Sequence, residues 1–356
     1  MKLSIKTSVL QDMVERSIKG AGMNKLIPIT SLMAIRLQNN KLTLITCDES
    51  NTLCIIQDNV EGDDFYAVVQ VEQFGKLIQK LTSDSTTLSV EDSILMVKAN
   101  GIYKIELPLD ENGDMVEYPV EDDIQGEGHE IPLSIVKTIL STNKAALAVT
   151  TETPCYTGYY VGDKVVTTDI YKICGLAAKL FDQPVLIAPQ TMNLLDVMTD
   201  EKILVYMEEE RIQFVTKNCV VYGSLMPDLA DFDIDSINDL LEEEFESSCK
   251  ISRNDLIALL ERIDLFVGAY DNQSITLTFT EKGIDISSKK SNGIETIAYV
   301  ESKNFKPYTC PIDISLLLQQ VKANQSDLLN LQYGNDRSVK IVDGNITQVI
   351  ALLEDE

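Results

Sequence analysis

The sequence has no tryptophan and a single histidine, His129. It has 30 lysine and arginine residues against 56 aspartate and glutamate residues, which gives a formal net charge of −26 at pH 7. A surface of this charge repels nucleic acid over long distances, so the composition excludes a protein that binds nucleic acid with its average surface. Any contact with DNA has to be local.

The seven cysteines show no metal-binding or disulfide pattern. They lie scattered through apolar segments, without a C-x-x-C motif, and only one histidine could join them in a zinc site. The N-terminal segment MKLSIKTSVLQDMVERS has no apolar signal core, and no run approaches the roughly 18 to 20 apolar residues of a membrane span. We therefore expect a soluble, cytoplasmic protein with no cofactor, no metal and no membrane partner.

Motifs for catalysis are missing as well. The sequence contains no G-x-x-x-x-G-K-[ST], G-x-G-x-x-G or G-x-S-x-G, so phosphate-binding loops and a nucleophile elbow are absent. His129 lies in the linker-like segment GEGHEIP, with no nucleophile beside it. Acidic clusters such as 208–210 could bind Mg²⁺ or Ca²⁺, but chance clusters are expected in so acidic a chain. We predict a protein that is not an enzyme and has no catalytic residues.

Three segments of the chain resemble one another, which indicates an internal repeat. Each follows a short apolar strand and places its apolar residues on one face of a helix, and the segments start at Val71, Pro189 and Pro311. The starts are 118 and 122 residues apart. Three further helices precede them at similar offsets, over residues 8–20, 133–145 and 253–264. Each third of the chain is therefore predicted to contain two helices.

Alternating apolar and polar residues predict paired strands between and after these helices, as in LMAIRLQNNKLTLITCD and TTLSVEDSILMVKANG. The predicted unit is a strand, a helix, three strands, a second helix and three more strands. We predict an α+β fold of three such units, over residues 1–124, 125–246 and 247–356. The acidic stretches near Glu121 and Glu242 are then joints between units or solvated faces.

Three such units in this order resemble the bacterial DNA polymerase III beta subunit, a DNA sliding clamp, over essentially the whole chain. The resemblance is carried by MKLSIKTSVLQDMV, PITSLMAIRLQNNKLTLITCDES and VQVEQFGKLIQKLTSDSTTLSVEDSILMVKANG. In the segment TTDIYK, Ile170, Tyr171 and Lys172 stand where the family has Gly, His and Arg. The final ALLEDE also departs from the family's ending. These departures indicate a divergent member, and we hypothesise that it is phage-encoded.

The resemblance implies a closed ring of two chains joined head to tail, with helices lining a hole for duplex DNA. It further implies a processivity factor that works at the replication site of the nucleoid. Such a factor tethers the replicative DNA polymerase and is opened by a clamp loader ATPase. Because a ring holds DNA by topology, weak contacts between basic side chains and phosphates suffice and permit sliding.

The distribution of charge agrees with this expectation. The six predicted helices, over residues 8–20, 71–82, 133–145, 189–199, 253–264 and 312–323, have net charges of 0, +1, +2, −1, −1 and 0. Their sum of +1 leaves −27 for the rest of the chain. Acidic residues are therefore depleted in the helices that would face DNA.

Basic residues on the polar faces of these helices are the predicted contacts with the DNA backbone. They are Arg16, Lys19, Lys25, Lys76, Lys80, Lys137 and Lys144. The alternative for any one of them is an ordinary solvated helix face.

The resemblance also implies an apolar pocket that binds short linear motifs of polymerases and other partners. The positions that match the family's pocket are Tyr156, Thr168, Ile170, Tyr171, Ile173, Val349, Ala351, Leu352 and Leu353. For Ile173, Val349 and Leu353, the alternative is that they are only the core of a strand. The ring interface implied by the resemblance would place Leu265 and Phe266 of one copy against Tyr103 and Ile105 of the next.

A second hypothesis is an acidic scaffold or DNA-mimic protein that binds replication proteins without encircling DNA. It would explain the net charge of −26, but not the near-neutral helices.

Overall fold

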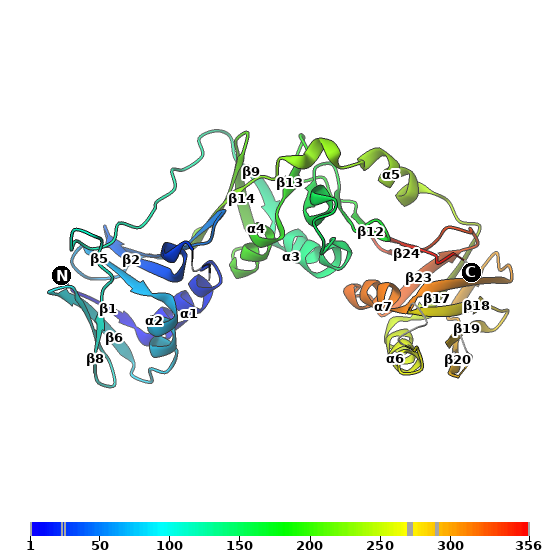
Figure 1. Cartoon of the computed structure of the whole chain (residues 1–356), viewed down its shortest axis with the longest axis horizontal. Coiled ribbons are helices and arrows are strands. Elements are labelled where there is room, and N and C mark those ends of the chain that lie inside the picture. Colours follow the sequence, from blue (N-terminus) through cyan, green and yellow to red (C-terminus); the bar gives the residue numbers. More distant parts are fainter. Residues whose placement is uncertain (1, 23, 25, 269–272, 289–291, 355–356) are drawn as a thin grey trace. The chain divides into compact units, whose positions relative to one another are not determined.

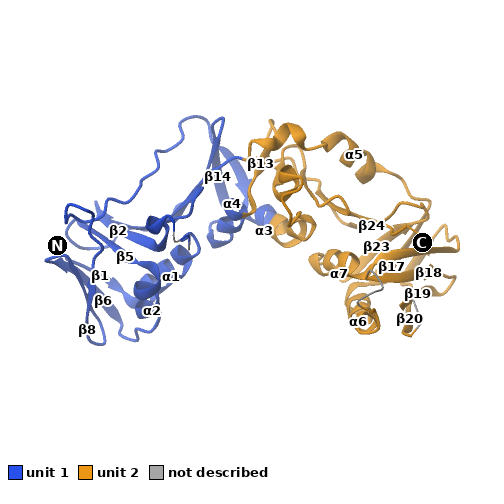
Figure 2. Ribbon diagram, viewed as in Figure 1, with its two compact units in different colours: residues 1–136, 190–225 blue, residues 137–189, 226–356 orange. Residues whose placement is uncertain are grey.

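The computed structural model describes residues 2–22, 24, 26–268, 273–288 and 292–354. The chain forms two compact units (Figure 2). Unit 1 contains residues 1–136 and 190–225, and unit 2 contains residues 137–189 and 226–356. Both units contain strands from the middle third of the chain, because that third is divided between them. This division does not follow the predicted boundaries at residues 124 and 246, which stay a prediction.

The described residues of the first third form eight strands and two α-helices (Figure 1). In chain order they are β1 (Lys2–Lys6), α1 (Thr7–Ile18), β2 (Leu32–Gln38), β3 (Lys41–Cys47), β4 (Asn51–Gln57), β5 (Phe65–Gln70), α2 (Val71–Gln79), β6 (Ser85–Glu91), β7 (Ile94–Lys98) and β8 (Ile102–Glu106). A short 3₁₀ helix, Pro28–Ser31, precedes β2.

The middle third repeats this order of elements. They are β9 (His129–Pro132), α3 (Leu133–Thr142), β10 (Tyr159–Val161), β11 (Val165–Thr168), β12 (Lys172–Leu176), β13 (Val185–Ile187), α4 (Pro189–Leu194), β14 (Lys202–Met207), β15 (Arg211–Val215) and β16 (Cys219–Ser224). A 3₁₀ helix, Pro154–Thr157, again precedes the strand that follows the first helix. An additional helix, α5 (Ile234–Glu242), follows β16.

The last third repeats the order once more, with one additional short strand, β21 (Glu301–Lys303). Its other elements are β17 (Ser247–Ser252), α6 (Arg253–Asp264), β18 (Ser274–Phe279), β19 (Gly283–Ser288), β20 (Ile294–Ala298), β22 (Tyr308–Asp313), α7 (Ile314–Ala323), β23 (Leu328–Tyr333), β24 (Ser338–Asp343) and β25 (Ile346–Ala351).

Strand pairing is the same in every third and confirms the predicted repeat. In each third, the first strand lies at the side of the three strands that follow the second helix and forms one sheet with them, as in the order β1-β6-β7-β8. The short apolar strand before the second helix forms one sheet with the three strands that follow the first helix, as in the order β5-β2-β3-β4. This short strand adds to the three strands predicted between the two helices. The fold is α+β with antiparallel sheets, as predicted.

Two strand pairs join sheets of neighbouring repeats. Strand β4 pairs with β16 in unit 1, which gives an eight-stranded sheet, and β12 pairs with β25 in unit 2, which gives a nine-stranded sheet. No pattern of residues predicted this continuity. It explains why the compact units cut through the middle third, since each half of that third shares a sheet with a neighbouring repeat.

In the first and last thirds of the chain, the two helices pack against each other, α1 on α2 and α6 on α7. In unit 1, α1 buries Leu10, Met13 and Val14, and α2 buries Phe74 and Ile78. The two helices approach closely at Gly75, where an added Cβ would lie 2.7 Å from Ile18 Cδ1.

The helix boundaries were predicted within a few residues, and α6 has the bounds expected from the sequence. Helix α7 begins two residues later than predicted, at Ile314, because the carboxylate of Asp313 caps it. This carboxylate accepts hydrogen bonds from the backbone N–H groups of Ser315, at 2.7 Å, and Leu316, at 3.1 Å. Helices α3 and α4 end early and continue as 3₁₀ turns, Asn143–Ala146 and Leu195–Val197.

Candidate functional site

The turn between β11 and β12 is held rigidly by its own side chains. The carboxylate of Asp169 accepts hydrogen bonds from the backbone N–H groups of Tyr171, at 3.1 Å, and Lys172, at 2.9 Å. Its second oxygen lies 2.6 Å from Lys172 Nζ, and this ion pair is almost buried, with the Lys172 side chain 6% exposed. The Thr168 hydroxyl donates to the Lys172 carbonyl oxygen at 2.9 Å. The geometry of the turn is therefore fixed without a ligand.

Two large side chains project from this turn into solvent. Ile170 and Tyr171 are 66% and 64% exposed. The backbone of Ile170 has φ +81°, in the left-handed region that β-branched residues rarely adopt. Such a conformation costs on the order of 1–3 kcal/mol. It is the position where the sequence resemblance places glycine, which adopts this conformation without strain.

The C-terminal strand lies directly beside the turn. Ile173 in β12 pairs with Val349 in β25. The backbone N–H of Ala351 donates to the Tyr171 carbonyl oxygen at 2.8 Å, and the N–H of Leu352 donates to the Arg337 carbonyl oxygen at 2.8 Å. The structure thus brings together the two sequence segments, 168–173 and 349–353, that were predicted to form one pocket. Ala351, Leu352 and Leu353 are half-buried.

The floor of this region is an apolar cluster that includes Cys155, Val166, Ile173, Phe232 and Val349. Ile173 and Val349 are only 3% and 4% exposed, so they belong to the core of the sheet, as the alternative interpretation held. Thr168 is also buried, at 2%. The exposed apolar surface comes instead from Ile170, Tyr171 and the segment after β25.

Phe232 is a residue that sequence analysis missed. Its ring stacks on Tyr160 with centroids 5.2 Å apart and meets the edge of Tyr156 with centroids 5.3 Å apart. Tyr156 is half-buried, and burial raises the pKa of its hydroxyl. An apolar aromatic residue within the acidic segment 228–235 was the available signal, because solvated linkers seldom contain one.

The predicted DNA contacts differ in how exposed they are. Lys76, Lys80, Lys137 and Lys144 are all exposed. The side chain of Lys19 is 50% exposed and lies 3.3 Å from the carboxylate of Asp196. Lys76 forms an ion pair with Glu72, one turn earlier on the exposed face of α2. Lys25 lies outside the described residues.

Arg16, a predicted DNA contact, forms hydrogen bonds within unit 1 that the sequence did not indicate. Its side chain is only 13% exposed. The guanidinium donates to the Val197 carbonyl oxygen at 3.1 Å and to the Asn218 side-chain oxygen at 3.0 Å. These bonds tie α1 to elements of the middle third, so the guanidinium is already occupied.

The residues predicted for the ring interface lie on or beside two edge strands. Within the described residues, β8 pairs only with β7, and β20 pairs only with β19. Leu265 and Phe266 are 80% and 51% exposed, and Tyr103 is half-buried. Ile105 is 2% exposed, so its side chain belongs to the core of unit 1 and not to the surface. Because side chains alternate along a strand, Ile102, three positions earlier in β8, points to the opposite face and is 65% exposed.

The thiols and acidic groups of the chain form no reactive cluster in the described residues. Burial raises the thiol pKa of Cys54, Cys174, Cys219 and Cys249 to about 12. No group of three or more His, Cys, Asp or Glu side chains in that part of the chain is placed to hold a metal ion. None of the helices described there is long and apolar enough to cross a membrane.

We expect the strained backbone of Ile170 to lower the stability of unit 2. Replacing Ile170 with Gly should raise the free energy of unfolding by about 1 kcal/mol, because relief of left-handed strain exceeds the entropy that glycine costs. Denaturant unfolding measures this change. The control is Asn59→Gly, since Asn59 has φ +59° and asparagine tolerates this region. If Ile170→Gly lowers the free energy of unfolding relative to this control, the backbone of Ile170 is not strained and the prediction is wrong.

No protein-family model matches the sequence, and no curated protein is significantly similar to it. Solved structures are similar over their full length. The DNA polymerase sliding clamp of Bacillus subtilis has 18% identity and a TM-score of 0.84, with 100% of both chains covered. The beta subunit of DNA polymerase from Streptococcus pyogenes has 17% identity and a TM-score of 0.86, again with 100% of both chains covered. The DNA polymerase III beta chain of Streptococcus pneumoniae has 16% identity and a TM-score of 0.87, with 99% of this chain and 100% of that chain covered. The chain therefore has, along its whole length, the fold of the bacterial DNA polymerase sliding clamps.

Proposed function

We propose that this protein is a DNA sliding clamp, a processivity factor without catalytic activity of its own. Two copies join head to tail into a ring that encircles duplex DNA and tethers a DNA polymerase. The observation that carries the proposal is the full-length similarity to sliding clamps, with TM-scores of 0.84 to 0.87 for the three bacterial structures. An acidic scaffold that never encircles DNA would account for the charge of −26, but it would not need this fold.

The two edge strands support closure of the ring. Strand β8 in unit 1 and strand β20 in unit 2 each have one side without a partner strand in the described residues. Exposed edges with apolar side chains are normally covered in a native assembly. Ile102 is 65% exposed on β8, and Ile294 is 60% exposed on β20. We propose that β8 of one copy pairs with β20 of the next, since main-chain hydrogen bonds would then satisfy both edges.

Apolar residues next to β20 enlarge this interface. Phe266 packs over Gly293, where an added Cβ would lie 3.0 Å from the ring. Leu265 precedes it and is 80% exposed. Arg262 holds Glu295 of β20 through two hydrogen bonds of 2.9 and 2.6 Å, which fixes the strand against α6. Leu265 and Phe266 thus form an exposed apolar patch beside a strand that the Arg262–Glu295 ion pair holds in place.

Contacts with DNA in this proposal come from the exposed lysines Lys76, Lys80, Lys137 and Lys144, with Lys19 and Lys25 as further candidates. Such contacts are electrostatic and do not depend on base sequence. Arg16 contributes by holding α1 in place, since its guanidinium already binds oxygens of Asp12, Val197 and Asn218 in unit 1.

The pocket around Ile170 and Tyr171 is the proposed docking site for linear motifs of the polymerase and of the clamp loader ATPase. A rigid turn that projects two large side chains beside a half-buried apolar segment offers anchors for aliphatic or aromatic residues. The acidic tail that begins at Glu354 favours motifs with a basic residue.

Changing Leu265 and Phe266 together to Asp should prevent the ring from forming. Sedimentation of the unchanged protein should give twice the 39.6 kDa mass of one chain, and the variant should give the mass of one chain. A control with equally exposed apolar residues is Leu26→Asp with Val149→Asp, at 90% and 96% exposure. This control should remain a dimer. A variant at Leu265 and Phe266 that sediments as the dimer would contradict the proposed interface.

Changing Lys76, Lys80, Lys137 and Lys144 together to Glu should weaken DNA binding while the protein stays folded. The slope of log affinity against log salt concentration should fall by roughly 0.9 for each ion pair between a lysine and a phosphate that the changes remove. The control changes four exposed lysines outside the helices, Lys41, Lys98, Lys217 and Lys282, and alters the net charge equally. Equal effects of the two sets on the salt slope would show that only net charge matters and would refute the assignment.

A further inference from the structure

Two segments connect the repeats of the chain. The first connecting segment, residues 107–128, follows β8 and lies in unit 1, and the second connecting segment, residues 226–246, follows β16 and lies in unit 2. The second contains helix α5, which packs on β12 and β25, whereas residues 107–128 contain no α-helix. The two segments therefore have the same place in the repeat and different structures.

The strands beneath the two segments start from turns of the same form. The carboxylate of Asp48, before β4, accepts hydrogen bonds from the backbone N–H groups two and three residues later. The carboxylate of Asp169, before β12, accepts from the matching two groups. The residues four positions after each aspartate, Thr52 and Ile173, are therefore equivalent.

Strand pairing extends this equivalence across the sheets. In each sheet, the equivalent residue pairs with a residue on the next strand, which pairs in turn with a residue on the strand beyond. These residues are Thr52, Tyr222 and Gln213 in unit 1 and Ile173, Val349 and Lys340 in unit 2. Gln213 and Lys340 thus occupy the same position, and both are buried, at 2% and 3% exposure.

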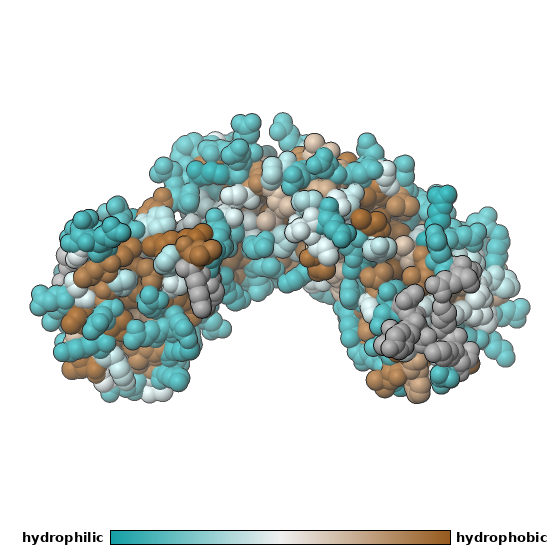
Figure 3. Space-filling view, in the orientation of Figure 1, coloured by the Kyte–Doolittle hydropathy of each residue, from teal (hydrophilic) through white to brown (hydrophobic). Residues whose placement is uncertain are grey.

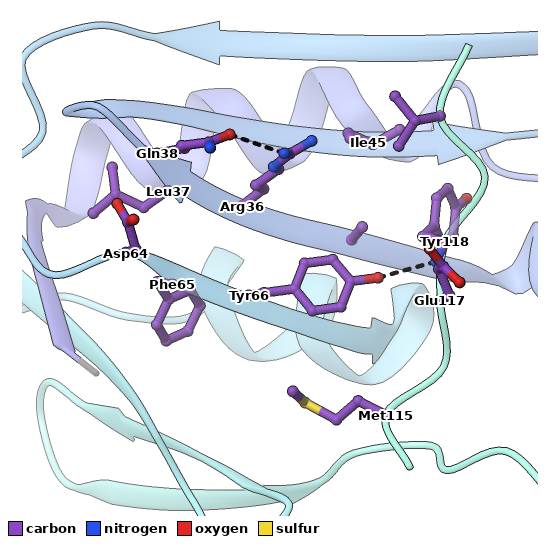
Figure 4. Close-up of a pocket in the computed structure, with 12 residues that line it drawn as sticks. Arg36, Leu37, Gln38, Ile45, Asp64, Phe65, Tyr66, Met115, Glu117 and Tyr118 are labelled. Carbon is purple, nitrogen blue, oxygen red and sulfur yellow. Dashed lines mark hydrogen bonds between the residues drawn. The ribbon is translucent and has the colours of Figure 1, made fainter.

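In unit 1, Gln213 is one of several contacts that hold the first connecting segment. Its side-chain oxygen accepts from the Ile124 N–H at 2.9 Å, and its Nε2 donates to the Asp123 carboxylate at 2.7 Å. Figure 4 shows a further anchor, the hydrogen bond of 3.0 Å from the Tyr118 N–H to the Tyr66 hydroxyl. Tyr118 also belongs to an apolar cluster with residues of β2, β3 and β5, and Figure 3 shows hydrophobic residues in the area of β2 and β5.

In unit 2, Lys340 binds the end of α5 and the residues after it. Its Nζ donates to the carbonyl oxygens of Leu241, at 2.9 Å, and Glu243. The same atom lies 5.0 Å from the centre of the Phe245 ring, a cation–π contact. Hydrogen bonds from an ammonium group are stronger than those between neutral groups. One buried lysine therefore holds three residues of the second connecting segment.

Helix α5 has little other packing against the sheet. Among its residues Ile234–Glu242, only Ile237 is buried. Two cavities, of about 320 and 420 Å³, share Leu241 and Glu242 in their walls. A second tether is Lys164, which donates to the Asn238 side-chain oxygen at 2.9 Å. Segments with few buried apolar contacts open locally at a low cost in free energy.

Repulsion within the second connecting segment opposes its closed position. Residues 226–246 contain nine Asp and Glu residues and no Lys, Arg or His. Like charges within a short segment repel one another and favour an extended chain. The cations that face the segment belong to Lys164 and Lys340 of the sheet and to Lys306, which pairs with Glu246. Lysines outside the segment therefore hold it against its own repulsion.

The second connecting segment also contributes to the candidate pocket. Phe232, two residues before α5, stacks on Tyr160 in the apolar cluster that forms the floor of the pocket. Ile237 of α5 belongs to the same cluster. Movement of α5 away from the sheet would therefore withdraw part of this floor.

We propose that the second connecting segment is a strap that opens from the sheet of unit 2 and closes on it, and that Lys340 is the lock that keeps it closed. In the open state, water replaces Lys340 at the carbonyl oxygens of Leu241 and Glu243, and α5 leaves the sheet. Opening then changes the floor of the candidate pocket and so regulates the binding of partners there. Only this last step rests on the proposed function.

Amide hydrogen exchange of the full-length protein measures the opening. Lys340→Met keeps an unbranched side chain at this position and removes its donors. Loss of two charge-assisted hydrogen bonds should raise the exchange rates of amides in residues 237–245 by about tenfold or more. Rates in residues 115–124 should stay unchanged, because that segment has anchors of its own. Unchanged rates in residues 237–245, or an equal rise in both segments, would overturn the proposal.

Two control variants separate the lock from general effects. Lys322→Met removes the same charge from α7, where the side chain is 48% exposed, and should leave the rates in residues 237–245 unchanged. Gln213→Met makes the equivalent change in unit 1 and should raise exchange at Ile124 alone, whose N–H it leaves without its acceptor. A rise in residues 237–245 with either control, as large as with Lys340→Met, would contradict the lock.

A second variant serves if Lys340→Met does not fold. Lys340→Gln introduces the side chain that unit 1 has at the equivalent position, and its shorter, uncharged amide should raise the rates by a smaller factor. Unchanged rates in that variant would then overturn the proposal. The experiment uses neither DNA nor a partner peptide, so its failure would leave the proposed function intact.

Discussion

The structure depends on two strand pairs, β4 with β16 and β12 with β25. Each joins the sheet of one repeat to the sheet of the next through main-chain hydrogen bonds. These bonds require no particular side chains, so three diverged repeats can still form continuous sheets of eight and nine strands. The segments that connect the repeats then cross these joined sheets. The candidate pocket lies where such a segment meets a sheet.

We call the strand pairs β4 with β16 and β12 with β25 the first and second junctions. Equivalent positions at the two junctions have similar backbone hydrogen bonds but different side chains. Asp48 accepts from the N–H groups of Ser50 and Asn51 in the same way as Asp169 accepts from those of Tyr171 and Lys172. By pairing, Tyr222 in unit 1 matches Val349 in unit 2. The Tyr222 hydroxyl donates to the Asp123 carboxylate at 2.7 Å. Burial, followed by this hydrogen bond, raises the pKa of Tyr222.

The first junction is therefore occupied by polar contacts of the chain itself, whereas the second presents apolar side chains. This difference explains why a peptide-binding pocket is proposed at the second junction only.

The repeat and most helices could be predicted from the sequence, because apolar spacing at helical and strand periods repeats about every 120 residues. The pocket segments 168–173 and 349–353 were predicted as one site through the family resemblance alone, since pairing between distant strands leaves no local signal. Ile105 was assigned to the ring interface, although its side chain faces the core. A shift of one residue along a strand moves a side chain from one face of the sheet to the other, so a small error in alignment is enough to exchange a buried and an exposed position. Arg16 was assigned to DNA, and no local pattern in the sequence indicated that its guanidinium would donate to Val197 and Asn218 of the middle third. Its contact with DNA stays a prediction.

A ring around DNA would hold the duplex by topology, and a retention experiment measures this directly. The protein is mixed with a linear duplex that has biotin at both ends, streptavidin then blocks the ends, and about 1 M NaCl removes proteins that are held by charge alone. We expect the protein to stay on the blocked duplex through the wash and to be released when a restriction enzyme cuts it. Loss of the protein during the wash, to the same extent as the variant with Leu265 and Phe266 changed to Asp, would contradict a ring around DNA.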